Sequence, residues 1–324
     1  MNDFRIPVTV ITGFLGAGKT TLLNQLIENH PKKKFAIIEN EFGKIGIDSD
    51  LIIGINENIF ELNNGCICCS LNSDFYQVID KLLNSKFVFN HLLVETTGIA
   101  DPLSIINAFL DGGGIQDNFK IDSVVCVVDA INIQNLIHDY SEIRKQLSVA
   151  DLIIINKIDA ADKTFVDKLT REISEISTLA SIKHTSFCDI SKIQVLDTDS
   201  YAAPQIEMST LKYVHHNQPQ KKLNHNHEIS TVAFQFDDVF DFSKFSLWIQ
   251  NFIFFNSNKI LRIKGILAFQ DYPERFIFHT VVDSFLLDPG KNWDQEKPFS
   301  KIIFIGKHLD KDELHEGLEQ LLVN

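Results

Sequence analysis

The chain has 324 residues, a length that predicts about two domains of roughly 150 residues each. Hydrophobic residues make up 44% and charged residues 23% of the chain, a globular mix that excludes a globally disordered or fibrous protein. Asp and Glu number 43 against 30 Lys and Arg, for a net charge of -13. This balance argues against nucleic acid as a partner, because binding to phosphates along a strand needs a basic face.

The compartment can also be predicted. The first residues lack a basic stretch followed by an apolar one, so no secretory leader is expected. No apolar run approaches the ~20 residues that a membrane helix needs. We therefore expect a cytoplasmic protein with no membrane partner, whose clustered thiols serve as metal ligands or catalysts rather than as disulfides.

Short apolar runs and helix-like stretches alternate over the first part of the chain. A helix is expected at 20–29, and strands are expected at 6–12, 35–38, 59–62, 91–95, 123–128 and 152–155. Three of these runs are continuous rather than alternating, which is typical of parallel strands covered on both faces. Residues 1–200 are therefore predicted to form an α/β domain, a doubly wound sheet with helices on each side.

The first expected strand is followed by a match to the phosphate-binding pattern G-x-x-x-x-G-K-[ST]. Glycines let the backbone turn so that its N–H groups face a polyphosphate, and the helix that follows offers a positive N-terminus. Lys19 can reach the β and γ phosphates, and the Thr20 hydroxyl can ligate Mg²⁺. The residues predicted to bind the nucleotide here are Gly13, Phe14, Leu15, Gly16, Ala17, Gly18, Lys19, Thr20 and Thr21.

Three of the five cysteines, Cys66, Cys68 and Cys69, follow an Asn-Asn-Gly sequence. Thiolates this close can converge on one soft or borderline ion, Zn²⁺ or Cu(I). Three sulfurs leave a fourth position open, which suits a transferable metal better than a structural one. We favour a metal site over a redox centre or packed thiols. Cys126 is expected to pack in a strand, and Cys188 is assigned no role.

The expected strand at 91–95 ends in the sequence Glu-Thr-Thr-Gly. This sequence takes the place of the D-x-x-G element that senses the γ-phosphate. Glu95 would contact Mg²⁺ through water or orient the attacking water, and the sequence does not separate these two roles. Gly98 would offer its N–H to the γ-phosphate. The residues predicted to act in catalysis are Lys19, Thr20, Glu95 and Gly98.

Asn156, Lys157 and Asp159 follow the apolar run at 152–155 and form the tetrapeptide N-K-x-D. At the end of a strand, this tetrapeptide is the guanine reader of P-loop GTPases. The Asp159 carboxylate would accept hydrogen bonds from guanine N1–H and N2–H₂, a donor pair that adenine lacks. These three residues are therefore predicted to bind the base of GTP. A further guanine loop would follow the next strand, near 184–186, but its sequence is too degenerate for residues to be assigned to it.

The α/β pattern fades after about residue 190 and gives way to a second composition. Residues 201–228 are polar, contain Pro204 and Pro219, and predict a linker. Four histidines lie in it, and they either collect metal or are simply solvated. These histidines are His215, His216, His225 and His227.

Residues 229–324 predict a smaller α+β domain. Strands are expected at 230–236, 260–269, 275–282 and 302–305, and helices at 242–255 and 310–323. Arg262 and Lys264 alternate along one strand, where they either grip a partner or protect an edge. The chain holds 26 Phe, most of which are expected to fill the core.

Taken together, these elements resemble the CobW/YjiA-type metallochaperone GTPases over essentially the whole chain. The resemblance is carried by the segments 13–21, 39–43, 64–69 and 95–102 in the first domain and by 261–266, 293–298 and 303–306 in the second. The C-x-C-C motif inside a P-loop GTPase is highly specific to this family.

The resemblance implies a GTPase that uses GTP, Mg²⁺ and Zn²⁺ and delivers zinc to a client metalloprotein. By position, Cys66, Cys68 and Cys69 would hold the transferred zinc, and Glu39 would add a metal-binding carboxylate. The position after Glu-Phe-Gly is usually acidic in the family and is Lys44 here. This departure weakens the case for a second, carboxylate-rich metal site.

The implied mechanism couples GTP hydrolysis to zinc transfer. GTP and Mg²⁺ order the switch segment 34–50, hydrolysis relaxes it, and the change in the zinc shell permits transfer. Two alternatives stay open: a zinc-storing or zinc-sensing GTP-binding switch, and a maturation GTPase for cobalt or nickel. The oligomeric state is also left open, a metal-dependent oligomer included.

Overall fold

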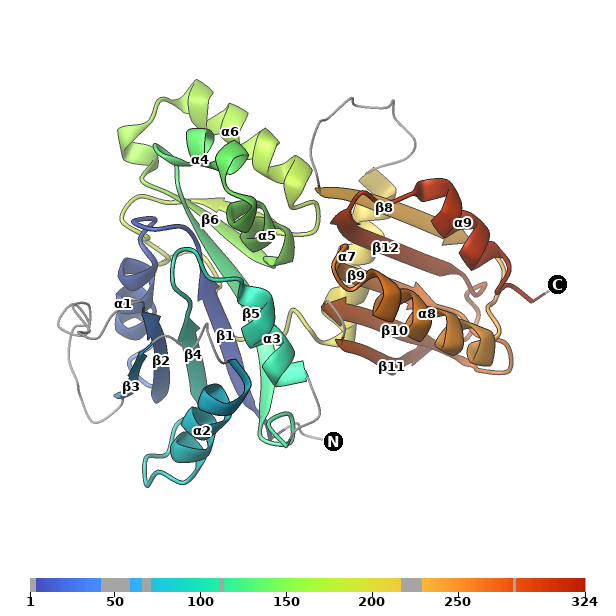
Figure 1. Cartoon of the computed structure of the whole chain (residues 1–324), viewed down its shortest axis with the longest axis horizontal. Coiled ribbons are helices and arrows are strands. Elements are labelled where there is room, and N and C mark those ends of the chain that lie inside the picture. Colours follow the sequence, from blue (N-terminus) through green and yellow to red (C-terminus); the bar gives the residue numbers. More distant parts are fainter. Residues whose placement is uncertain are drawn as a thin grey trace. The chain divides into compact units, whose positions relative to one another are not determined.

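The computed structural model describes residues 4–41, 59–65, 71–110, 114–216, 229–281 and 284–323. The chain divides into two compact units, Met1–Ser200 and Tyr201–Asn324, both traced in Figure 1. No helix in the described ranges is long and apolar enough to cross a lipid bilayer.

The first unit is built on a parallel sheet of seven strands among the described residues, in the order β3-β2-β4-β1-β5-β6-β7. These strands are β1 (Ile6–Thr12), β2 (Phe35–Glu41), β3 (Ile59–Gly65), β4 (His91–Glu95), β5 (Phe119–Asp129), β6 (Leu152–Asn156) and β7 (Ser181–His184). Because all of them run the same way, the loops that follow the strands gather along one edge of the sheet.

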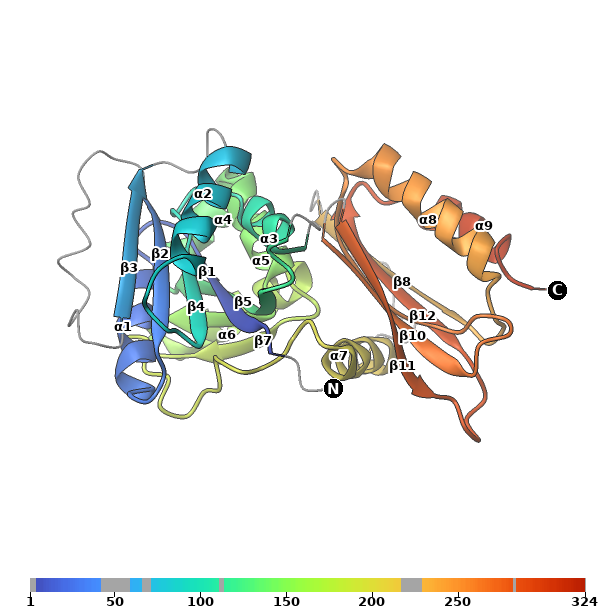
Figure 2. The same ribbon diagram turned by 90° about the horizontal axis from the view of Figure 1, so that it is seen from below.

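Helices cover both faces of this sheet (Figures 1 and 2). They are α1 (Lys19–Asn29), α2 (Leu71–Leu83), α3 (Pro102–Leu110), α4 (Ile133–Asp139), α5 (Ser141–Val149) and α6 (Lys163–Ile176). Leucines of α1 pack on one face, against Ile11, Leu93 and Val125. Apolar side chains of α4, α5 and α6 pack on the opposite face, against β5 and β6. The predicted doubly wound α/β fold is confirmed.

The second unit is an antiparallel sheet in the order β11-β10-β9-β12-β8. Its strands are β8 (Ile229–Phe236), β9 (Ile260–Leu267), β10 (Glu274–Val281), β11 (Ser284–Asn292) and β12 (Ser300–Lys307), and its helices are α7 (Ala203–His216), α8 (Phe242–Asn256) and α9 (Lys311–Glu319). Helices α8 and α9 cover one face and α7 lies on the other (Figure 2). The expected smaller α+β domain is confirmed.

Phenylalanine fills the core between this sheet and α8 and α9, as expected. The buried phenylalanines include Phe234, Phe236, Phe240, Phe245, Phe276, Phe278 and Phe304. Side chains of Asp241 and Asp310 cap the two helices by accepting backbone N–H groups of their first turns. Phe254 and Phe255, near the end of α8, are exposed instead.

Two elements of the second unit differ from the sequence-based expectation. Residues 203–216 fall in the expected linker but form α7, because Ile206 and Leu211 pack on Ile266 and Ile277 of the sheet. Pro204 sits in the first turn of α7, where its missing N–H has no helical partner to lose. Strand β11 was not expected because it contains a proline and a glycine. It is an edge strand, which tolerates both.

Arg262 and Lys264 lie on β9, which is flanked by β10 and β12. They are 1% and 3% exposed. The interpretation of these residues as solvated protection of a sheet edge is therefore wrong, because β9 is an inner strand.

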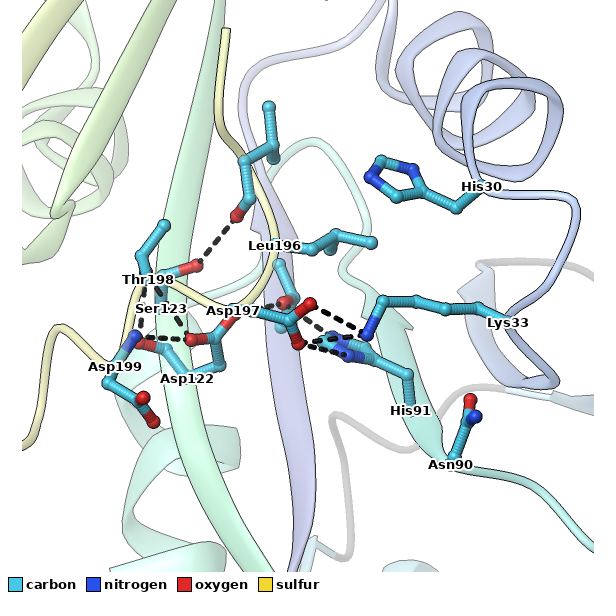
Figure 3. Close-up of polar contacts among 12 residues, drawn as sticks. His30, Lys33, Asn90, His91, Asp122, Ser123, Leu196, Asp197, Thr198 and Asp199 are labelled. Carbon is cyan, nitrogen blue, oxygen red and sulfur yellow. Dashed lines mark hydrogen bonds and ion pairs between the residues drawn. The ribbon is translucent and has the colours of Figure 1, made fainter.

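A buried polar network lies at the amino-terminal half of the parallel sheet (Figure 3). Thr9 Oγ1 on β1 is 2.9 Å from His91 Nε2 on β4 and 3.4 Å from Asp122 Oδ2 on β5. Asp122 also accepts the backbone N–H of Asp199 at 2.6 Å. The network thereby fastens the last residues of the first unit to three strands of its sheet.

His91 is the titratable centre of this network. Its side chain is fully buried, and Nδ1 is 3.8 Å from Asp197 Oδ1, which also pairs with Lys33 at 2.8 Å. Burial lowers the pKa of His91 from 6.5 to about 3, with a further contribution from the Lys33 ammonium. The imidazole is therefore neutral in the folded chain at physiological pH.

We expect the first unit to lose stability as the pH falls below about 6.5, since His91 takes up a proton there only when unfolded. The loss grows by about 1.4 kcal/mol per pH unit until the folded pKa is reached. Urea unfolding at pH 7 and pH 5.5 should show about 1 kcal/mol more loss in wild type than in a His91→Gln variant. Equal losses in the two proteins would contradict this account of His91.

Candidate functional site

The segment between β1 and α1 turns through conformations that glycine adopts most readily. Gly13, Gly16 and Gly18 have φ angles of 137°, 75° and 110°, in the left-handed half of the φ range. A Cβ on Gly13 would overlap the carbonyl oxygen of Val127. The glycines of the predicted phosphate loop are therefore required by its geometry.

Helix α1 begins at Lys19, with Gly18 as an N-cap that provides no side-chain oxygen to its first turn. An N-terminus of this kind attracts an anion, because its N–H groups carry a partial positive charge. Lys19 is 8% exposed, and its Nζ is 3.5 Å from the Phe14 carbonyl oxygen across the loop. Backbone N–H groups and an ammonium form the donor set that a polyphosphate requires.

Glu39 and Glu95 lie side by side at the carboxyl edge of the sheet. They are register partners on β2 and β4, and Glu39 is buried. After Glu95 the chain stays fixed to β1, because the Thr96 N–H donates to the Ile11 carbonyl at 2.9 Å. Adjacent carboxylates beside a phosphate loop are a typical oxygen donor set for a divalent cation.

Gly98 lies directly on the phosphate loop. A Cβ at Gly98 would come within 2.5 Å of the Leu15 nitrogen. The neighbouring Thr97 Oγ1 is buried and has no hydrogen-bond partner among the residues that the structure describes. A buried hydroxyl of this kind normally has a bound partner, so it fits a site that receives a phosphate group or its water.

Asn156 joins the end of β6 to the phosphate loop and to the chain after β7. Its Nδ2 donates to the Ala17 carbonyl at 3.1 Å. Its Oδ1 accepts from the Cys188 backbone N–H at 2.8 Å and from Thr185 Oγ1 at 3.3 Å. One buried amide thus joins two loops to the end of β6, and exposed Asp159 follows it in the short turn Ile158–Ala160.

Lys157 lies across the phosphate loop. Its Nζ donates to the Gly16 carbonyl at 2.8 Å and pairs with Asp129 Oδ2 at 2.8 Å. Burial alone would raise the pKa of Asp129, but hydrogen bonds from Lys157, the Ile131 N–H and Asn132 outweigh burial and lower it. Asp129 is therefore a carboxylate that holds Lys157 in place.

Most of the predicted nucleotide residues meet at this one edge of the sheet, which the order of the parallel strands brings about. Thr20 and Thr21 follow Lys19 in the first turn of α1, and the side chain of Leu15 is exposed. The predicted metal ligands Cys66, Cys68 and Cys69 lie outside the described residues, as do His225, His227 and most of the switch segment. Strand β3 ends at Gly65, the residue before this cluster.

No set of three or more His, Cys, Asp or Glu residues within the described ranges is arranged to hold a metal ion. Cys126 and Cys188 are buried, and burial raises the pKa of each thiol to about 12. The packing role expected for Cys126 is confirmed by its place in the core.

Four contributing residues were not found from the sequence: Asp129, Gln146, Thr185 and Cys188. Asp129 ends a strand at the same edge as Glu95 and Asn156, which is a usable signal. Cys188 donates its backbone N–H to Asn156 and its thiol to the Gly18 carbonyl at 3.4 Å, two contacts that only the fold creates. Gln146 lies on α5 and reaches the Gly98 loop, a contact that only the fold creates.

Two family models match this chain. The family model of the CobW/HypB/UreG nucleotide-binding domain matches residues 7–184, and that of the cobalamin synthesis protein cobW C-terminal domain matches residues 229–322. The chain is similar to the zinc chaperone YjiA of Escherichia coli strain K12, at 31% identity over 98% of both chains. It is also similar to the zinc-regulated GTPase metalloprotein activator 1 of Schizosaccharomyces pombe, at 30% identity over 94% of this chain and 83% of the relative.

A solved structure extends this likeness over both units. The crystal structure of Zn(II)-bound YjiA GTPase from E. coli aligns with 100% of both chains, at a TM-score of 0.75 and 27% identity. The two family models together cover most of the chain, and the relatives match along nearly its full length. The chain therefore belongs to the CobW/HypB/UreG family and carries the cobW C-terminal domain.

Proposed function

We propose that this chain is a GTP-hydrolysing zinc chaperone, which binds zinc and passes it to a client metalloprotein under control of the nucleotide. The observation that carries the nucleotide part is the joining of two loops by Asn156 and Lys157. Through these bonds, a base reader after β6 and a phosphate loop after β1 become one rigid site. Support for the zinc part comes from relatives named zinc chaperones and from a Zn(II)-bound neighbour.

In this proposal, the residues of the phosphate loop and the first turn of α1 bind the phosphates through N–H groups, and Lys19 neutralises their charge. Asn156 and Lys157 hold the base reader, and the Asp159 carboxylate accepts two hydrogen bonds from guanine. Thr20 and one carboxylate at the strand ends would hold Mg²⁺, which would stabilise the negative charge of the phosphates during hydrolysis.

The proposed hydrolytic centre lies between the phosphate loop and the turn after β4. Glu95 at the end of β4 is placed to orient the attacking water directly or through the Mg²⁺ shell. The Gly98 N–H is proposed to meet the γ-phosphate, since Gly98 sits against Leu15 of the phosphate loop. Donors fixed in advance at this point stabilise the charge that develops on the transferred group.

The zinc site is proposed to form at the same edge. Cys66, Cys68 and Cys69 follow β3 directly, and Glu39 on the adjacent β2 lies in register with Glu95. A thiolate cluster with an acidic neighbour suits Zn²⁺, which accepts sulfur and oxygen ligands. Strand β2 lies between β3 and β4 and pairs with both. A movement of the proposed γ-phosphate sensor, Glu95–Gly98 after β4, can therefore reach the zinc ligands through β2.

The choice of guanine is tested by an Asp159→Ala variant. Loss of two charge-assisted hydrogen bonds of about 1.5 kcal/mol each is expected to weaken GTP binding about 100-fold, while the weak binding of ATP stays unchanged. Calorimetric titration with both nucleotides measures this difference. An Asp167→Ala variant removes the same charge from an exposed position on α6 and should bind GTP like wild type. Equal losses for GTP and ATP would contradict the assignment of Asp159 to the base.

A further inference from the structure

Gln146 occupies an unusual place for a glutamine, in the buried face of helix α5 and only 1% exposed. Both donor positions of its amide are used. Nε2 donates to the Gly98 carbonyl at 3.2 Å and to the Ala100 carbonyl at 3.2 Å. A buried amide is retained only where its hydrogen bonds offset the loss of hydration, and these bonds go to one tight turn.

The turn that Gln146 holds begins just after the fixed end of β4. Thr96 is bonded to β1 through its backbone and through its hydroxyl, which donates to Thr12 Oγ1 at 3.0 Å. From Thr97 to Ala100 the chain leaves the sheet and closes a turn, with the Ala100 N–H donating to the Thr97 carbonyl at 3.0 Å. The Gln146 amide supports this turn from the side of α5.

Helix α5 makes two further contacts, one near the start of α3 and one to the phosphate loop. Lys145 pairs with Asp101 at 2.9 Å, and Asp101 in turn accepts the Leu103 N–H at the start of α3. Just before the first turn of α5, the ring of its N-cap residue Tyr140 lies 5.1 Å from the ring of Phe14 in the phosphate loop. Helix α5 and its N-cap residue therefore contact both the turn after β4 and the phosphate loop.

We propose that Gln146 is a positioning residue for GTP hydrolysis, which holds the Gly98–Ala100 turn against the phosphate loop. This inference rests on the proposed function. Gly98 packs tightly on the phosphate loop, because it lies against the backbone nitrogen of Leu15 and leaves no room for a Cβ. If the amide is lost, the two carbonyls have no donor, the turn can move away, and the Gly98 N–H misses the γ-phosphate. Small displacements of such a donor cost a large part of its effect.

The proposal predicts that loss of the Gln146 amide affects GTP hydrolysis but not GDP binding. GDP has no γ-phosphate, so it makes no contact with the Gly98 turn, and its affinity should not depend on Gln146. We expect a Gln146→Met variant, which keeps the length and loses the donors, to lower kcat for GTP about 10-fold. Its affinity for GDP should stay within about twofold of wild type.

Steady-state GTP hydrolysis and calorimetric GDP binding measure the two quantities. Ser148→Ala is the matched control, because Ser148 is equally buried on α5 and, among the described residues, its hydroxyl bonds only to the Lys145 carbonyl of its own helix. The control is expected to hydrolyse GTP like wild type. A parallel loss of GDP affinity in Gln146→Met, or an unchanged kcat, would overturn the positioning role.

A second variant keeps the test decisive if Gln146→Met fails to fold. Gln146→Glu has the same shape, and only its protonated form carries an O–H that can donate to one of the carbonyls. Its kcat relative to wild type should therefore rise as the pH falls, and a constant ratio would refute the proposal. Absence of GTP hydrolysis by the wild-type chain would overturn the proposed function together with this inference, whereas an active wild type with unaffected variants overturns the inference alone.

Discussion

An Asn156→Ala variant is expected to bind GTP and GDP about 100-fold more weakly than wild type. Asn156 is 2% exposed, and its amide supplies the bonds to the Ala17 carbonyl, the Cys188 N–H and the Thr185 hydroxyl. Alanine leaves a buried carbonyl and a buried N–H without partners, at about 1–3 kcal/mol each. Both the phosphate loop and the loop after β7 then lose their common support.

The loss of affinity should be the same for GTP and GDP, because the bonds of Asn156 go to the phosphate loop and to the loop after β7 rather than to the turn proposed to contact the γ-phosphate. Calorimetric titration with GTP and GDP measures it, and thermal unfolding should show a lower midpoint for the same reason. Asn118→Ala is the matched control, since the amide of this exposed asparagine makes a long 3.4 Å bond to Gly114. Wild-type affinity in Asn156→Ala would show that the two loops do not depend on this amide.

Residues whose chemistry lies in their side chain and in a local motif could be predicted. The phosphate loop is one case, because glycines with positive φ, a lysine and a helix start are consecutive in the chain. The Asn156 and Lys157 pair is another, because the motif coincides with the end of a continuous apolar strand. In both cases the strand-to-loop boundary fixes the position of the motif in the sheet.

Contacts that depend on backbone groups or on distant elements could not be predicted. The Cys188 N–H that binds Asn156 can come from any residue except proline. The Thr185 hydroxyl and the Cys188 thiol of the same loop reach Asn156 and Gly18, which are distant in the sequence. Gln146 gives no signal on its own helix, because its partners lie at Gly98 and Ala100. The position of Asp129 at a strand end marks it as a candidate, but its bond with Lys157, 28 positions later, is created only by the fold.

The second large effect concerns zinc. Changing Cys66, Cys68 and Cys69 together to serine is expected to weaken zinc binding about a thousandfold or more, because zinc binding by thiolates contributes many kcal/mol and serine hydroxyls are poor ligands. Competition with a chromogenic zinc chelator measures the affinity. Cys126→Ala is the control, since Cys126 is buried on β5 with its pKa raised to about 12, and zinc affinity should stay unchanged. Unchanged affinity in the triple variant would refute the ligand assignment.

The proposed link between GTP and zinc follows from the pairing of strands in the parallel sheet. Strand β2 pairs with β3 up to Gly65, the residue before the cysteine cluster, and with β4 up to Glu95, where the proposed γ-phosphate sensor Glu95–Gly98 begins. In the proposed function, a nucleotide that fixes the end of β4 would also restrain β2 and, through β2, the end of β3 at Gly65. We expect the GTP state to hold zinc more firmly than the GDP state, so that hydrolysis favours transfer to the client.

Zinc affinity measured on the same preparation, once with a non-hydrolysable GTP analogue and once with GDP, tests this central claim most directly. The account predicts at least about tenfold tighter zinc binding in the GTP-analogue state, a coupling of about 1.4 kcal/mol. Equal affinities in the two states, or tighter binding with GDP, would contradict it. Equal affinities would indicate a passive zinc store in place of a nucleotide-driven chaperone.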